Sequence, residues 1–283
     1  MVRPLFSDGW HRQRQILIAL SGVGALLLTA GIALVLQRFW QDAIEPAGAP
    51  SVRQAAAPAP PAQALWRSPL RRQCNAGSPI LRQRLHSQLN ALPQRIRRLR
   101  IDPSNYGRRH RQDAYGQPVA HTPQLVVLHE TVYGLNSAIN TFTTHHPHDG
   151  DQVSYHMLIG EKGEIVQAVD PADRAFGAGY SAFRGRWAVT NASMAGSVNN
   201  FALHLSLETP LDGENNAARH SGYTAAQYDA LAVVLADWMQ RFNIPADHIT
   251  THRHVDLGLE RADPRSFDWS ALQVRLAALD RLC

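Results

Sequence analysis

The sequence contains few of the residues and motifs that mark several common classes of enzyme. Only two of its 283 residues are cysteines, Cys74 and Cys283, and neither lies in a CxxC pair, so neither is expected to bind a metal or act as a nucleophile. In an exported protein these two could instead form a disulfide. No Gly-x-Ser-x-Gly motif is present, which argues against a serine hydrolase of the α/β type. No repeat with a period of about 20–50 residues is visible, which excludes a solenoid or a propeller.

The composition is that of a folded protein with one uneven feature. Hydrophobic residues make up 45% of the chain and charged residues 18%, and the length suits one catalytic domain with an N-terminal extension. Basic residues are concentrated in residues 67–111, which lack the interleaved aromatic residues and recognition motifs of a nucleic-acid interface. Attraction to anionic headgroups or wall polymer and a solvated helix face are the remaining interpretations. The arginines concerned are Arg71, Arg72, Arg82, Arg84, Arg95, Arg97, Arg98, Arg100, Arg108 and Arg109.

A long apolar run near the N-terminus predicts a membrane anchor. Residues 16–36 read ILIALSGVGALLLTAGIALVL, which carries no charge and is about as long as a spanning helix must be. Arg3, Arg12 and Arg14 precede the run, so the positive-inside rule predicts that the N-terminus lies in the cytoplasm and that the chain after the run is exported. A cleavable signal peptide is the alternative, since residues 47–49 read Ala-Gly-Ala, but its apolar core would be shorter. We therefore expect a membrane-anchored protein with its catalytic domain in the periplasm or cell envelope.

Composition and periodicity divide the chain into four segments. We predict a cytoplasmic N-terminus and transmembrane anchor at 1–40, a Pro- and Ala-rich linker at 41–65, an Arg-rich and partly helical extension at 66–121, and a catalytic domain at 122–283. From residue 122 onward strand-like and helix-like segments alternate, which predicts an α/β fold with one sheet and covering helices. Strands are expected at 124–128, 154–159, 164–169 and 201–207, and helices at 137–144, 223–242 and 270–282.

Two groups of residues carry side chains that could bind zinc. His129 directly follows the apolar run 125–128, at the end of a predicted strand, where functional groups concentrate. The second group is 249–256, ITTHRHVD, followed by Asp263 and Pro264. Neutral imidazole and carboxylate are the donors of catalytic zinc sites, in which three protein ligands leave one position open. These residues do not have the HExxH spacing, so on their own they leave structural roles open.

Five ordered sequence blocks resemble the zinc-dependent N-acetylmuramoyl-L-alanine amidase family. They are LVVLHET, VSYHMLIGEKGEIVQAV, NNFALHLSLETP, SGYTAAQYDALAVVLADW, and TTHRHVD with RADPRSFDW, and they span residues 123–269. This family, amidase type 2, includes the amidase-type phage lysozymes and is related to peptidoglycan recognition proteins. The resemblance implies an α/β fold with a single mixed central sheet flanked by helices. It also implies hydrolysis of the amide bond between N-acetylmuramic acid and L-alanine in peptidoglycan.

The resemblance assigns three zinc ligands. In the family these are the histidine that closes the first strand, the histidine of the TTHR block and the acid of the DP pair, which fall here on His129, His252 and Asp263. His254 is the alternative to His252, because residues two apart on a strand share one face. Only the family's alignment favours His252 over His254.

The resemblance also assigns three residues to the reaction. Glu208 ends a Leu-Ser-Leu-Glu segment similar to the family's Ile-Gly-Ile-Glu strand and is expected to be the general base. Tyr155 precedes His156, and Arg261 stands where the family has a lysine; both are expected to face the scissile carbonyl, although arginine differs from lysine in geometry. His204 stands where the family has a small polar residue, and it shares a strand face with Glu208, so it could enter the site.

Functions of two other classes remain compatible with the sequence. One is a non-catalytic peptidoglycan-binding receptor on the same fold, which the presence of Asp263 disfavours because inactive relatives commonly lose this ligand. The other is a membrane-tethered scaffold that holds a partner or the wall through the Arg-rich segment. Among the remaining candidates, Tyr133, Asn140 and Trp187 could line a substrate groove, and His220 and His248 are expected at the surface.

Overall fold

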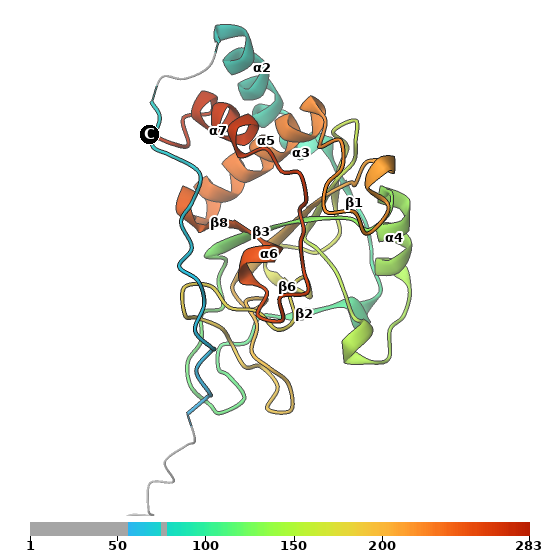
Figure 1. The fold of residues 1–283 in the computed structure, drawn as a ribbon, viewed down its shortest axis with the longest axis vertical. Coiled ribbons are helices and arrows are strands. Elements are labelled where there is room, and N and C mark those ends of the chain that lie inside the picture. The colour runs from blue at the N-terminus through green and yellow to red at the C-terminus, as the bar shows by residue number, and fades with distance from the viewer. Residues whose placement is uncertain (1–55, 75–77) are drawn as a thin grey trace, which may run out of the picture. The chain divides into compact units, whose positions relative to one another are not determined.

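A six-stranded sheet organises the described part of the chain, residues 56–74 and 78–283 of a computed structural model (Figure 1). Its neighbouring strands are parallel except β5 and β4, which are antiparallel, so the predicted α/β fold with a mixed central sheet and covering helices is confirmed. A second, two-stranded antiparallel sheet, which the sequence did not predict, pairs β2 (Tyr106–Arg108) with β6 (Asp173–Ala175). The order across the main sheet is β1 (Ile96–Arg98), β5 (Ile165–Gln167), β4 (Met157–Ile159), β7 (Ala202–Leu207), β3 (Leu125–Glu130) and β8 (Ile249–Thr251).

The longest described helix, α5 (Ala225–Phe242), packs across one face of the sheet. Thr224 and Gln227 form the capping box that its sequence predicts, because each side chain accepts a hydrogen bond from the other residue's backbone N–H. Its apolar side chains pack against the strands and against two further helices, α2 (Pro79–Asn90) and α7 (Trp269–Ala278). The other helices are α3 (Leu92–Arg95), α4 (Leu135–Thr143) and α6 (His252–Val255), and the 3₁₀ turns are η1 (Pro103–Asn105), η2 (Asp149–Asp151), η3 (Leu211–Gly213) and η4 (Ala246–His248).

The two longest strands, β3 and β7, are buried along their whole length. Strands covered on both faces need apolar side chains on both, which is why LVVL at 125–128 is a continuous apolar run. In ALHLSL at 202–207 the polar His204 and Ser206 interrupt the run on one face only. Because β7, β3 and β8 are parallel neighbours, their carboxyl ends meet at one edge of the sheet. Open α/β sheets bind ligands at that edge, and His129 lies there.

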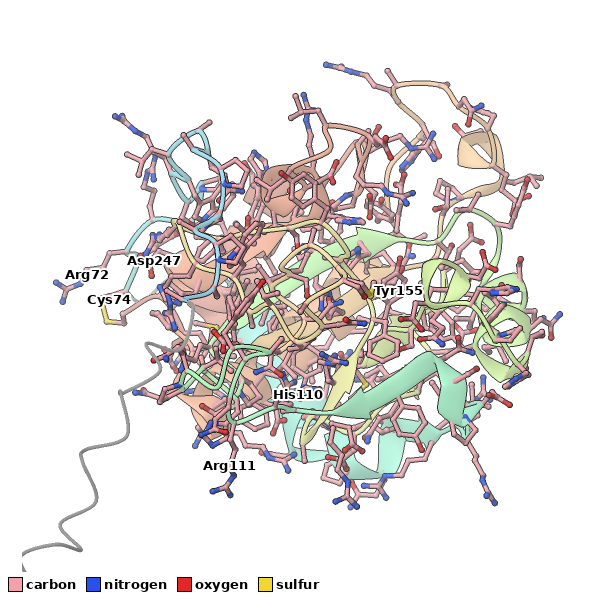
Figure 2. All side chains as sticks on the ribbon, turned by 90° about the horizontal axis from the view of Figure 1, so that it is seen from below. Arg72, Cys74, His110, Arg111, Tyr155 and Asp247 are labelled. Carbon is pink, nitrogen blue, oxygen red and sulfur yellow. A yellow bond between two sulfur atoms is a disulfide. The ribbon has the colours of Figure 1, made fainter. Side chains whose placement is uncertain are left out.

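The Arg-rich extension is part of the folded unit that spans Ala55–Cys283. It supplies β1 to the edge of the central sheet and α2 to the helical layer. Arg84 forms an ion pair with Asp229 of α5 at 2.9 Å. Arg109 is largely buried and donates hydrogen bonds to backbone carbonyls, and burial lowers its pKa to about 10. Some of the charge in this stretch therefore holds the fold together, whereas Arg72 and Arg111 project from the surface (Figure 2).

The described end of the predicted linker lies on the domain. Within residues 56–74, the Pro58 carbonyl accepts a hydrogen bond of 2.8 Å from Trp187 Nε1. Gln63 Nε2 donates to the Ala182 carbonyl at 2.9 Å. This stretch is extended as expected, but side-chain hydrogen bonds fix it along the protein surface.

Cys74 and Cys283 form a disulfide, which ties the C-terminus to the segment that precedes α2. Cys74 is marked in Figure 2. The predicted membrane anchor at 16–36 lies outside the described residues. Within residues 56–74 and 78–283, no helix has the length and the apolar composition needed to cross a bilayer.

Candidate metal centre

His129 is the penultimate residue of β3 and is completely buried. It pairs with Ser206 of the parallel strand β7, so these two side chains share one face of the sheet. This face lies opposite the one that packs on α5, because the α5 layer contacts the alternate residues Val126 and Leu128. Local strand alternation therefore aims His129 away from the main core and towards the segments that follow β8.

His252 and Asp263 come from those segments and meet His129. His129 Nδ1 lies 3.2 Å from Asp263 Oδ2, and His252 Nδ1 lies 3.0 Å from Asp263 Oδ1. One possible ligand atom from each residue lies within 4.8 Å of the other two. Ligands about 2.1 Å from a tetrahedral zinc ion are about 3.4 Å apart, so the histidine–aspartate distances fit a shared ion. The structure thus brings together the three residues predicted as zinc ligands.

The protonation states of this cluster suit metal binding. Burial lowers the pKa of His129 to about 4, so its imidazole is neutral at pH 7 and has a lone pair for a metal. Burial alone would raise the pKa of Asp263, but hydrogen bonds from His129 and His252 outweigh it and hold the pKa well below its ordinary value. A neutral imidazole beside a carboxylate is the donor set that zinc prefers.

Two predicted catalytic residues lie beside the cluster. The ring of Tyr155 stacks on His129 with 4.4 Å between centroids, and Tyr155 is labelled in Figure 2. Burial, followed by the negative charge of Asp263, raises the pKa of Tyr155, so its hydroxyl stays protonated. The Arg261 side chain is exposed, and its positive charge acts on the pKa values of both His129 and Tyr155.

Both carboxylate oxygens of Glu208, the predicted general base, accept hydrogen bonds from backbone N–H groups. Its Oε1 accepts a hydrogen bond of 2.6 Å from the backbone N–H of Leu135, the first residue of α4. Its Oε2 accepts from the N–H of Glu161, in the turn between β4 and β5, at 2.8 Å. Glu208 therefore connects a helix start to a turn. The β7 side chains on the His129 face are Ala202, His204 and Ser206.

Comparison with known proteins identifies the family of the chain. Residues 119–266 match the family model described as N-acetylmuramoyl-L-alanine amidase. The chain belongs to this amidase family. It is 34% identical over 119 residues to the 1,6-anhydro-N-acetylmuramyl-L-alanine amidase AmpD of Citrobacter freundii, an alignment that covers 42% of this chain and 54% of that protein. It is likewise 34% identical over 125 residues to AmpD of Escherichia coli, covering 44% and 58% of the two chains.

The chain thus spans little more than half the length of the curated relatives it matches. Among solved structures, a selenomethionine AmpD derivative is 29% identical, with a TM-score of 0.48 and coverage of 63% of this chain and 92% of that one. The structure named PlyL is 18% identical, with a TM-score of 0.36, and covers 56% and 80%.

In this amidase-family site, local backbone structure separates His252 from His254. The sequence left open a strand at residues 252–254, on which the two side chains would share a face. That expectation is wrong, because residues 252–255 form the helical turn α6, where residues two apart point about 200° apart around the axis. His254 Nδ1 is hydrogen-bonded to Thr251 Oγ1, and the His254 ring packs on Trp66. The structure therefore places His252 in the cluster and His254 outside it.

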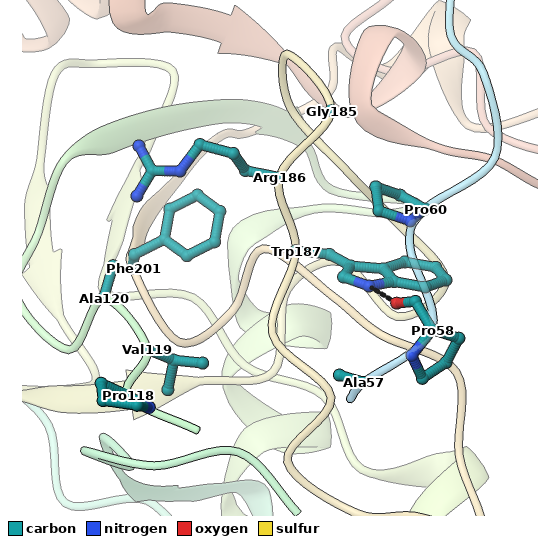
Figure 3. A pocket seen from close by; sticks show the side chains of 10 residues that line it. All are labelled: Ala57, Pro58, Pro60, Pro118, Val119, Ala120, Gly185, Arg186, Trp187 and Phe201. Atoms are coloured by element: carbon teal, nitrogen blue, oxygen red, sulfur yellow. Dashed lines mark hydrogen bonds between the residues drawn. The ribbon is translucent and has the colours of Figure 1, made fainter. Parts of the chain in front are cut away.

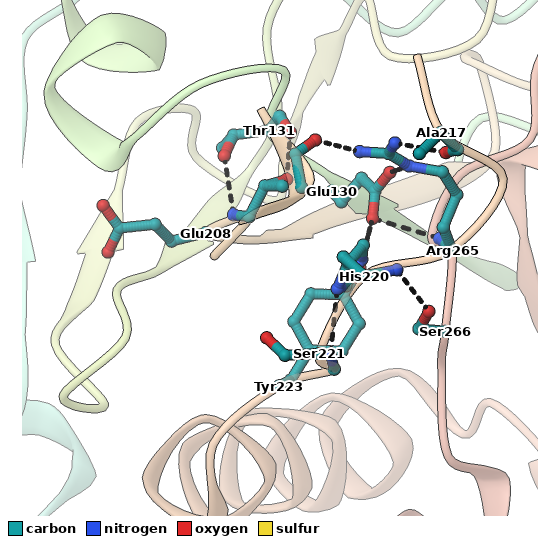
Figure 4. Close-up of polar contacts among 12 residues, drawn as sticks. Glu130, Thr131, Glu208, Ala217, His220, Ser221, Tyr223, Arg265 and Ser266 are labelled. Atoms are coloured by element: carbon teal, nitrogen blue, oxygen red, sulfur yellow. Dashed lines mark hydrogen bonds and ion pairs between the residues drawn. The ribbon is translucent and has the colours of Figure 1, made fainter. Parts of the chain in front are cut away.

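A second polar network is centred on Glu130, the residue that follows the ligand His129. The buried carboxylate of Glu130 forms an ion pair with Arg265 and accepts hydrogen bonds from Tyr223 and from His220 Nε2, the latter at 3.0 Å (Figure 4). The expectation that His220 is a surface residue is wrong, since its side chain is completely buried. A charged residue ending a buried strand was the sequence signal for such a network. Because Arg265 follows Asp263 by two residues, the ion pair fixes the chain that carries the third ligand.

A pocket of about 320 Å³ is lined by residues other than those of the metal cluster (Figure 3). Its walls include Pro58 and Pro60 of the N-terminal segment, Trp187 beside them, and Phe201. Trp187 was a candidate for a substrate groove, and its indole N–H donates a hydrogen bond to the Pro58 carbonyl. None of the residues predicted to act in catalysis or metal binding lines this pocket.

Proposed function

We propose that the protein is a zinc-dependent amidase that hydrolyses the bond between N-acetylmuramic acid and L-alanine in peptidoglycan or its fragments. The observation that carries this proposal is the convergence of His129, His252 and Asp263, which are up to 134 residues apart in sequence. The names of the AmpD relatives support the choice of bond, since they specify an anhydromuramyl-L-alanine amide.

Zinc held by these three residues would supply a Lewis acid that polarises the amide carbonyl and activates a water molecule at neutral pH. The chain's own contribution is to hold three donors in place and to exclude bulk water from His129. The Glu130–Arg265 ion pair supports the position of Asp263. The lowered pKa values of His129 and Asp263 mean that neither of these two side chains has to lose a proton at pH 7 before binding.

Tyr155 and Arg261 are proposed to stabilise the oxyanion that develops on the carbonyl oxygen. The raised pKa keeps the phenol of Tyr155 protonated, so it can donate a hydrogen bond, and the arginine contributes a positive charge. Donors of this kind are worth about 2.7–4 kcal/mol each in other hydrolases.

The assignment of the general base to Glu208 stays a prediction. Both of its oxygens accept backbone hydrogen bonds from Leu135 and Glu161 in this structure, so a role in proton transfer requires the side chain to release one of them. A base must lie within hydrogen-bond reach of the proton that it takes, although catalytic contacts often form only with substrate bound.

Product analysis tests the proposed function. We expect the zinc-loaded protein to release free stem peptides from purified sacculi or muropeptides, seen by mass spectrometry, and to lose this activity with a chelator. His129→Ala and Asp263→Ala should abolish both zinc binding and activity. A fully active His129→Ala protein would refute the assignment, and zinc binding with no product from any muropeptide would favour the non-catalytic receptor.

We also propose that the catalytic domain is exported and held at the membrane. The charge-free run at 16–36 and the preceding arginines support this, as does the Cys74–Cys283 disulfide, since disulfides persist in oxidising compartments. The full chain should sediment with membranes and dissolve in detergent but not in high salt. Replacing residues 1–40 with a cleavable export signal should make the protein soluble, and an unchanged distribution would count against the anchor.

A further inference from the structure

The second ring nitrogen of His129 has a partner that the family pattern does not assign. His129 Nδ1 faces Asp263, whereas Nε2, on the other side of the ring, lies 3.0 Å from His204 Nδ1. Both side chains are completely buried. Within the described residues, His204 is the hydrogen-bond partner of Nε2. We propose that His204 is a positioning residue that holds the His129 ring with Nδ1 directed at the metal, an inference that rests on the proposed zinc site.

The chemistry of imidazole makes this contact decisive. A neutral histidine has one protonated nitrogen and one lone pair, and the nitrogen that binds a metal is selected by the hydrogen bond made at the other. In the metal-free structure His129 Nδ1 is hydrogen-bonded to Asp263, so metal binding at Nδ1 requires the tautomer that is protonated at Nε2, with His204 Nδ1 as the acceptor. His204 then carries its own proton on Nε2, a buried atom with no hydrogen-bond partner among the described residues. Without that acceptor, the buried Nε2–H has no partner and the ring loses its orientation.

The surroundings of His204 fix its own ring. It lies on β7 in register with Val127, two residues before Ser206, and so on the same sheet face as His129. A Cβ added to the buried Gly177 would come within 2.4 Å of His204 Nδ1, so glycine leaves the space that the imidazole occupies. The His156 ring lies parallel to it at 5.9 Å, and the backbone N–H of His204 donates to His156 Nδ1.

Zinc affinity of His204 variants tests the proposal. His204→Phe keeps a ring of similar size but removes the nitrogen, and we expect the dissociation constant, measured by competition with a chromophoric chelator, to rise about 10–100-fold. His204→Asn places an amide group where Nδ1 was, and should recover most of that loss. ¹⁵N NMR of zinc-loaded wild type and His204→Asn should show His129 protonated at Nε2. The matched control is Thr250→Val. The Thr250 hydroxyl is buried on the same sheet face as His204 and has no hydrogen-bond partner among the described residues, so its removal should leave the zinc affinity unchanged.

Gly177→Ala provides a second perturbation that leaves His204 in the sequence. Its methyl group should displace the His204 ring and weaken zinc binding, and the same substitution should have a much smaller effect in the His204→Phe background. If His204→Phe does not fold, the zinc affinity of Gly177→Ala relative to wild type and to His204→Asn decides the matter. Equal zinc affinity in wild type, His204→Phe and Gly177→Ala would overturn the role of His204. A wild-type protein that binds no zinc would overturn the metal site itself.

Discussion

We expect the metal-free protein to lose stability in mild acid, because three of its buried histidines have lowered pKa values. His129, His156 and His204 are completely buried, and burial lowers the pKa of His129 to about 4 and holds the other two well below their ordinary value of 6.5. In the unfolded chain each histidine takes up a proton as the pH falls below about 6.5, but in the folded chain it does not. Each histidine whose pKa is lowered by folding therefore makes the folded state less stable as the pH falls from about 6.5 towards the pKa of that histidine in the folded protein.

The size of the effect follows from linkage. At pH 5 a histidine that stays neutral only in the folded state costs about 2 kcal/mol of stability relative to pH 7.5. The three together cost about 6 kcal/mol, which is comparable to the whole stability of many domains, about 5–15 kcal/mol. We expect the free energy of unfolding to fall with a slope approaching 4 kcal/mol per pH unit near pH 5.

Urea denaturation at a series of pH values between 7.5 and 5, with a chelator present, measures this slope. His204→Asn removes one of the three titrating groups and should reduce the slope by about 1.4 kcal/mol per pH unit. His148→Gln is the matched control, because His148 is exposed and its substitution should leave the slope unchanged. A free energy of unfolding that stays constant from pH 7.5 to 5 would refute the reasoning.

Three further predictions concern the structure around the site. Cys74→Ser opens a loop closed across 209 residues and should lower the free energy of unfolding by about 2–4 kcal/mol in urea denaturation; no change would mean the disulfide does not constrain the unfolded chain. Glu208→Gln should cost about 1–3 kcal/mol of stability through a lost acceptor, whereas full stability and zinc content with no turnover would support the general-base role. Glu130→Leu leaves the Arg265 guanidinium without its buried partner and should cost about 3–5 kcal/mol and weaken zinc binding; an unchanged zinc affinity would show that this ion pair does not position Asp263.

The elements with strong local patterns were predicted closely. The strand expected at 201–207 is β7, Ala202–Leu207, and the helix expected at 223–242 is α5, Ala225–Phe242. A strand buried on both faces and a capped amphipathic helix each depend on the pattern of neighbouring residues, so they can be predicted from the local sequence. The strand β8 is only three residues long, and its place in the sheet depends on pairing with β3, more than 120 residues earlier.

The sequence alone determined the family, the α/β class and the set of residues able to bind zinc, because each depends on residue types in a local order. Only the tertiary structure decided which of these residues meet. The helical turn α6 brings His252 into the cluster and leaves His254 against Trp66. Strand register places His204 behind His129, and two backbone N–H groups hold the Glu208 carboxylate. These outcomes depend on contacts between distant segments and on the direction of each side chain, which no local pattern specifies.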